Sequence, residues 1–119
     1  MTDKRLLQLL QREPDRGLSL LMNRYMGLVC TVVKARLFAV CTAEDMEECV
    51  SDVFCEFYYR RNGFDTSRGT VKAYLCAIAR HKAIDLYEAK VRELSFFSQE
   101  APEETEPSAE ETLFDEEAH

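Results

Sequence analysis

The sequence lacks any apolar run long enough to cross a bilayer, which takes about 20 consecutive apolar residues. Its first residues (MTDKRLLQLLQRE) contain neither an uninterrupted apolar stretch nor a small-residue cleavage site, which argues against a secretory signal. We therefore expect a cytoplasmic protein with no membrane-bound part. At 119 residues, the chain is long enough for one domain with a modest core.

Cysteine pairs with the spacing of a metal or redox site are also missing. The five cysteines form no C-x-x-C pair, and neither His81 nor His119 has a ligand-like spacing to them. They are Cys30, Cys41, Cys49, Cys55 and Cys76. Most stand among apolar neighbours, which predicts small buried side chains in a reducing cytoplasm and disfavours the alternative, a metal or disulfide site. We expect no metal and no cofactor.

Residue patterns typical of catalysis are absent as well. The four glycines form no phosphate-binding loop, and no nucleophile stands at a suitable spacing from a general base. The sequence therefore favours a binding protein over an enzyme.

Charge is distributed unevenly along the chain, whose net charge is −7. Residues 99–119 hold nine acidic residues and no Lys or Arg. The other 13 of the 22 acidic residues and all 15 basic residues lie in 1–98, which gives that part a net charge of +2. With Pro102 and Pro107 among its acids, the C-terminal segment is typical of a disordered tail or linker. A solubilising role and a specific role both remain open for it.

Apolar periodicity predicts an all-α fold, a compact bundle of about four helices without a strand. The expected helices span residues 3–12, 18–40, 43–61 and 71–94. Pro14 ends the first helix and can open the second, and Thr42 and Thr70 are the expected N-caps of the last two. Gly27 is expected to mark close helix packing. We divide the chain into a short N-terminal helix (1–17), a helical domain (18–95) and an acidic tail (96–119).

Two neighbouring segments carry opposite charge. Residues 44–56 hold six acids and no Lys or Arg, whereas residues 60–92 hold eight basic residues against three acids. This pattern predicts one partner with a basic protein surface and a second that is a polyanion. Four carboxylates at spacings of three and four form one stripe on the third helix, here called the acidic stripe. They are Asp45, Glu48, Asp52 and Glu56. The alternative is an ordinary solvated helix face.

A series of short motifs follows in a recognisable order. The motifs are Asp52-Val53-Phe54, Phe64-Asp65, Arg68-Gly69-Thr70, Ala73-Tyr74-Leu75, Ile78-Ala79-Arg80 and Ala83-Ile84-Asp85-Leu86. In this order and spacing, residues 18–91 resemble region 2 of the extracytoplasmic-function (ECF) sigma factors, which belong to the sigma-70 family. The resemblance implies a bacterial transcription initiation factor domain with two partners, RNA polymerase core and promoter DNA.

The resemblance also implies roles for particular residues. The acidic stripe would bind the clamp helices of the polymerase β′ subunit. The loop before the last helix would capture a base flipped out of the non-template strand of the promoter −10 element, and that helix would lie along the same strand. The residues implied to bind DNA are Phe64, Asp65, Arg68, Lys72, Tyr74, Arg80, His81 and Lys82. Aromatic faces can stack on unstacked bases and cations can hold phosphates, but a role for Phe64 as a lid on the core is equally open.

Several positions depart from the pattern of these sigma factors. Tyr74 stands where Trp is usual, and His81 stands where Asn is common. Glu88 and Ala89 replace residues that are usually Arg, which argues against strong duplex binding upstream of the −10 element. Asp85 matches the pattern, and we expect a structural role for it, buried or half-buried on its helix and paired with a nearby Lys or Arg.

Some alternatives stay open from the sequence. A complete sigma factor of this class has a second domain, region 4, with a helix-turn-helix. These 119 residues contain none, so they are either a segment of a longer chain or a factor that naturally consists of region 2. The competing function is a protein-interaction module, either a sigma-like decoy or the target of an anti-sigma factor, without DNA binding. We expect a monomer, with an anti-sigma factor as a further partner.

Overall fold

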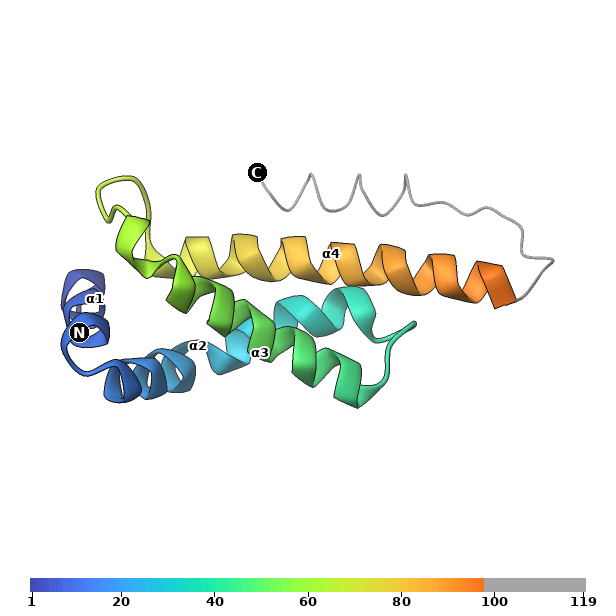
Figure 1. Cartoon of the computed structure of the whole chain (residues 1–119), viewed down its shortest axis with the longest axis horizontal. Coiled ribbons are helices and arrows are strands. Elements are labelled where there is room, and N and C mark those ends of the chain that lie inside the picture. Colours follow the sequence, from blue (N-terminus) through green and yellow to red (C-terminus); the bar gives the residue numbers. More distant parts are fainter. Residues whose placement is uncertain (98–119) are drawn as a thin grey trace.

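A computed structural model describes residues 1–97 as four α-helices and one short 3₁₀ helix (Figure 1). The elements are α1 (Asp3–Arg12), α2 (Pro14–Leu37), α3 (Ala43–Tyr59), η1 (Arg61–Gly63) and α4 (Val71–Phe97). The predicted all-α fold is confirmed, and residues 1–97 contain no strand. The predicted acidic tail lies outside the described residues from position 98 on, whereas positions 96 and 97 still belong to α4. No helix in this part of the chain has the length and apolarity needed to span a bilayer.

The helix ends follow from local chemistry. α2 begins at Pro14. Proline has no backbone N–H, and this causes no loss at the first helical position, because an N–H there would have no partner within the helix. The Thr42 side chain and Asp45 form a capping box that starts α3. α3 ends two residues before the predicted end, where the chain tightens into η1. Phe38 falls within the span predicted for the second helix (18–40), but it lies just past the end of α2 and is 73% exposed.

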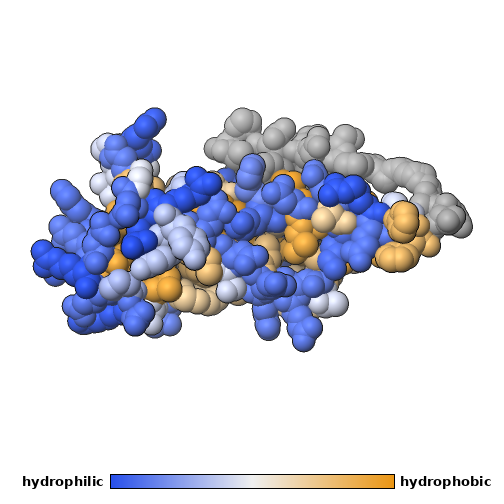
Figure 2. All heavy atoms as spheres, in the orientation of Figure 1, coloured by the Kyte–Doolittle hydropathy of each residue, from blue (hydrophilic) through white to orange (hydrophobic). Residues whose placement is uncertain are grey.

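One hydrophobic core joins all four helices. α2, α3 and α4 pack against one another, and α1 closes the end of the bundle at which α4 begins (Figure 1). Phe54 and Phe57 are the largest fully buried side chains, and Leu6 and Leu10 bring α1 into the same core. The visible face in Figure 2 is mostly hydrophilic, with apolar atoms at one end of the molecule and in smaller patches across its middle. Buried contacts therefore hold α1 in the same core as the longer helices.

Gly17, and not Gly27, lies at a close helix contact. A Cβ atom at Gly17 would lie 2.8 Å from the backbone N and Cα atoms of Leu10, so only glycine allows α1 and α2 to meet this closely. A Cβ at Gly27 would have no neighbour within 4 Å. The expectation that Gly27 marks close packing is therefore wrong.

Hydrogen bonds fasten α1 to the rest of the bundle at its N-terminal end. The Asp3 carboxylate accepts a hydrogen bond from the Val71 backbone N–H at 2.9 Å, across 68 positions of sequence. The Arg24 side chain donates to the Met1 carbonyl, also at 2.9 Å. The Thr70 hydroxyl accepts from the Ala73 N–H at 3.0 Å, as expected of an N-cap. The start of α4 is thus held both by its own cap and by a carboxylate from α1.

We expect Asp3→Ala to lower the free energy of unfolding by about 1 kcal/mol. The variant loses a capping interaction and a negative charge at the N-terminal end of the α4 dipole. Urea unfolding followed by circular dichroism measures the loss. Asp15→Ala is the matched control, because it removes an exposed carboxylate from the first turn of α2. Equal losses in the two variants would contradict the role assigned to Asp3.

Candidate functional site

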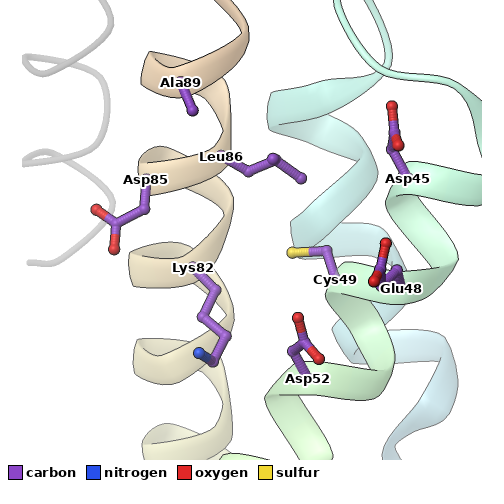
Figure 3. A pocket seen from close by; sticks show the side chains of 8 residues that line it. All are labelled: Asp45, Glu48, Cys49, Asp52, Lys82, Asp85, Leu86 and Ala89. Carbon is purple, nitrogen blue, oxygen red and sulfur yellow. The ribbon is translucent and has the colours of Figure 1, made fainter.

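The acidic stripe borders a groove of about 330 Å³ between α3 and α4. Figure 3 shows Asp45, Glu48 and Asp52 on the α3 side of this groove, with Lys82 on the α4 side. The predicted alignment of the acidic residues along one face of α3 is therefore present. The groove brings them beside cations of α4 that the sequence pattern had assigned to a separate surface.

Ion pairs divide the acidic stripe into two kinds of carboxylate. Glu56 is held by Lys82 and by Arg60, each at 2.9 Å. Asp45 is held by Lys90 at 3.2 Å. Glu48 and Asp52, in the middle of the stripe, are exposed and form no ion pair with another residue of 1–97. The two outer carboxylates therefore tie α3 to α4, and the two middle ones face solvent.

These contacts shift the titration of the paired groups. The hydrogen bond from Lys82 holds the pKa of Glu56 below its ordinary value, and the same contact raises the pKa of Lys82. The Thr42 backbone N–H, followed by Lys90, lowers the pKa of Asp45. Asp45 in turn raises the pKa of Lys90. Each pair is therefore fully charged at neutral pH.

We expect the Glu56→Gln variant to lose less stability than the wild type on acidification. A carboxyl whose pKa is lowered by folding stabilises the fold above its unfolded value of 4.5, and this contribution disappears as pH falls through the folded pKa. For Lys82 the sign is opposite, so its contribution is lost only as pH rises above 10.5. Urea midpoints on both sides of pH 4.5 measure the difference. Glu47→Gln, at an exposed position of α3, should keep the wild-type acid dependence, and an unchanged profile for Glu56→Gln would refute the expectation.

A second hollow, of about 390 Å³, lies between the loop that precedes α4 and the first turns of that helix. We call it the loop pocket. Its walls include Phe64, Asp65, Arg68, Gly69, Tyr74 and Ala77. Thus four of the eight residues expected to bind DNA meet in one place. Gly69, which has no side chain, and Ala77 add little bulk to this lining.

Two aromatic rings form one wall of the loop pocket. The Phe64 and Tyr74 ring centroids lie 5.2 Å apart, and both rings pack against the buried Phe57 ring. Phe64 and Tyr74 are only half-buried. Both roles considered for Phe64 are therefore compatible with its position, because the ring covers the core on one side and borders a hollow on the other.

The loop itself is shaped by Asp65. Its carboxylate accepts hydrogen bonds from the Ser67 backbone N–H at 2.9 Å and from the Ser67 hydroxyl at 2.7 Å. These bonds, the one from the hydroxyl first, lower the pKa of Asp65. Such a turn holds the chain locally, and the Arg68 N–H then bonds to the Asp65 carbonyl at 3.0 Å. Asp65 thus orders the segment that carries Arg68.

The remaining residues expected to bind DNA do not share one surface. Lys72 and His81 are exposed on α4, and Arg80 is half-buried, three residues after Ala77 of the loop pocket. Lys82, by contrast, lies in the groove beside the acidic stripe and binds Glu56. This position of Lys82 could have been predicted from the sequence, because Lys82 follows Ile78 by four residues and therefore falls on the buried side of the helix.

Asp85 differs from its expected environment. The side chain is exposed, and in Figure 3 it points away from α3. It forms no ion pair with any residue of 1–97. The expectation of a buried or half-buried, paired carboxylate is therefore wrong.

The cysteines are five free thiols in different environments. Cys49 is buried, Cys55 is exposed and the other three are half-buried, so the expected burial is confirmed for Cys49 and wrong for Cys55. Burial, followed by the nearby Asp52 charge, raises the pKa of Cys49 to about 11. This thiol therefore stays protonated and unreactive at neutral pH. Within residues 1–97, no cluster of His, Cys, Asp and Glu is arranged to hold a metal ion.

Comparison with known proteins identifies the family. A family model described as Sigma-70 region 2 matches residues 21–93, which is more than half of the chain. The match includes most of α2, all of α3 and the loop, and α4 as far as Glu93, and it leaves α1 outside. No curated protein and no solved structure gives a significant match. Region 2 proteins are non-enzymatic factors that bind RNA polymerase core and promoter DNA. The chain therefore belongs to the sigma-70 region 2 family, whose members act in transcription initiation.

Proposed function

We propose that the chain is region 2 of an ECF sigma factor, acting in the cytoplasm. In this proposal the exposed carboxylates of the acidic stripe bind the β′ clamp helices, and the loop pocket captures a base from the non-template strand of the −10 element. The observation that supports it most directly is the loop pocket. It combines half-buried aromatic rings with an exposed Arg68, and its one carboxylate, Asp65, is engaged with Ser67.

The chemistry of the loop pocket suits an unstacked base. Extracting a base from a duplex costs a few kcal/mol, and stacking on an aromatic ring returns about 1–3 kcal/mol per base. Phe64 and Tyr74 offer ring surface, and Arg68 can pair with a phosphate. Holding the base shifts the duplex equilibrium toward the open form without any bond chemistry. The polymerase then carries out the reaction.

The acidic stripe suits a basic protein partner. Glu48 and Asp52 are exposed, and carboxylates in such positions can accept paired hydrogen bonds from arginines of a partner. Asp45 and Glu56 serve the fold instead, because their ion pairs with Lys90 and Lys82 hold α3 against α4. We therefore assign polymerase binding mainly to the two middle residues of the stripe.

One observation favours the alternative, a protein-interaction module without DNA binding. Lys82 is occupied by Glu56, so fewer cations face a DNA strand than the sequence pattern suggested. On our proposal this reduces the affinity for single-stranded DNA without abolishing it, because Arg68 and Lys72 remain exposed.

A salt titration separates these functions. We expect weak binding to single-stranded −10-like DNA, with a logarithmic salt slope of about −1.4 for two phosphate contacts through the exposed Arg68 and Lys72. Arg68→Gln should reduce the slope by about 0.7. Lys82→Gln, which removes the same charge from the groove, should leave it unchanged. Fluorescence anisotropy at several salt concentrations measures the affinity and the salt slope of each variant. An affinity that does not depend on salt, or a slope that Arg68→Gln leaves unchanged, would contradict the proposal.

Removing residues 99–119 should raise the same affinity, because this segment holds nine acidic residues and no Lys or Arg. Those charges compete with DNA for the cations of the domain, and salt screens the competition. The increase in affinity on removing this segment should therefore become smaller as the salt concentration rises. The anisotropy titration measures it, and equal affinities at low salt would exclude the competition.

A further inference from the structure

A third hollow, of about 490 Å³, lies between α1, η1 and the loop. We call it the α1 hollow. Besides Asp65, its polar lining residues are Lys4, Gln8, Gln11, Arg61, Asn62 and Thr66. The first three belong to α1, which is outside the segment that matches the family model. We propose that the α1 hollow binds a second nucleotide of the same single strand, next to the base held in the loop pocket. This inference rests on the proposed function.

The lining of the α1 hollow has the chemistry of a nucleotide site. Lys4 and Arg61 supply positive charge for a phosphate, and the side-chain amides of Gln8, Gln11 and Asn62 can both donate to and accept from a base edge. Asp65 is the one acidic residue of the lining, and its carboxylate is engaged with Ser67. The hollow therefore attracts a nucleic acid strand more than it repels one.

Arg61 is held in place before any ligand arrives. Its guanidinium carbon lies 3.8 Å from the centroid of the Tyr58 ring, and the group donates to the Tyr58 carbonyl at 2.7 Å. A guanidinium held over an aromatic ring offers a surface on which a base can stack. Contact of a nucleotide with Arg61 would therefore cost little entropy of that side chain.

The two hollows are adjacent. Gly63, Phe64 and Asp65 line both of them, so the Phe64 segment separates one from the other. Figure 1 shows α1 and the loop at the same end of the bundle. A strand with one base in the loop pocket therefore passes Phe64 directly into the α1 hollow. This continuity argues for a neighbouring nucleotide of the same strand as the occupant.

The α1 side of the hollow is rigid. Leu6 and Leu10 are fully buried, and the close contact at Gly17 together with the bond from Val71 to Asp3 fixes the helix. Lys4, Gln8 and Gln11 follow at spacings of four and three, which places them on one face. The bundle thus presents this face to the loop without a conformational change.

The test compares single strands of different length. The 119-residue chain is titrated at low salt into fluorescein-labelled oligothymidylates of several lengths. The shortest strands are too short to fill both hollows, and the longest have about 10 nucleotides. Gln8→Ala combined with Gln11→Ala keeps the net charge and should weaken the longest strand on the order of fivefold. This double variant should bind the shortest strands with the same affinity as the wild type. Lys4→Ala should also reduce the salt slope for the long strand by about 0.7.

Lys34→Ala is the matched control, because it removes an exposed lysine of α2 that lines a different hollow beside Met22 and Met26. It should leave both the affinity and the salt slope unchanged. If the α1 variants bind long strands like the wild type while short strands still bind, this inference is overturned and the proposed function stands. If the wild type binds no strand of any length, single-strand capture in the loop pocket fails, and the inference fails with it. A loss confined to long strands supports both.

Discussion

Asp52→Lys is expected to weaken binding to core RNA polymerase by roughly 30-fold or more. Reversing a charge that pairs across an interface removes an attraction and adds a repulsion, and losing one partner of a close pair costs about 2–5 kcal/mol. Asp52 suits this test because it is exposed and forms no ion pair within residues 1–97. The fold should tolerate the change, since exposed substitutions usually alter stability by less than about 0.5 kcal/mol. Competition for core enzyme against a labelled wild-type domain measures the loss.

Glu47→Lys provides the matched control for this experiment. It makes the same change of charge on the same helix, but Glu47 lies beside the hollow between α2 and α3 and not on the acidic stripe. Glu56→Lys is a poor probe, because it would also break the contacts to Lys82 and Arg60. Equal affinities of the Asp52 and Glu47 variants would show that total charge, and not the stripe, governs binding to polymerase.

Local features made much of the fold predictable. The first helix was predicted at its observed bounds, because four leucines mark its apolar face and Pro14 ends it. The start of α3 followed from Thr42, whose side chain and Asp45 complete a capping box. These signals lie within a few residues of the feature they determine. An error arose at a helix end where no such signal was identified, because the second helix was predicted to run to residue 40 whereas α2 ends at Leu37 and leaves Phe38 exposed.

Pairing between distant segments was harder to predict. The charge pattern separated an acidic segment from a basic one, but it did not show that Lys82 and Lys90 of α4 neutralise Glu56 and Asp45 of α3. The bond between Asp3 and Val71 likewise joins two parts of the chain that no local signal connects. The α1 hollow also depends on packing between distant segments, since α1 and η1 are about fifty residues apart in sequence. Sequence motifs therefore indicated the residue types of the site, and the packing decided which of them act together.

Phe64→Ala is expected to lower promoter opening on duplex DNA by roughly 5- to 150-fold, because stacking on an aromatic ring contributes about 1–3 kcal/mol per base. The ring lines the loop pocket and packs against Tyr74 and Phe57. Its loss therefore removes stacking surface and also part of the lid on the core. Open-complex formation with core polymerase, on a duplex promoter and on the same promoter with the −10 region already unpaired, measures the effect.

The two templates and a second variant separate stacking from stability. A captured base must first leave the duplex, so Phe64→Ala should impair the duplex template most, and the unpaired template should recover part of the activity. Tyr87→Ala removes another half-buried aromatic ring that packs on the core, far along α4 from the loop pocket. It should lower the urea midpoint to a comparable extent and leave promoter opening close to the wild-type level. If both variants impaired opening equally, loss of stability would account for the result, and Phe64 would be a lid on the core without a role in capturing the base.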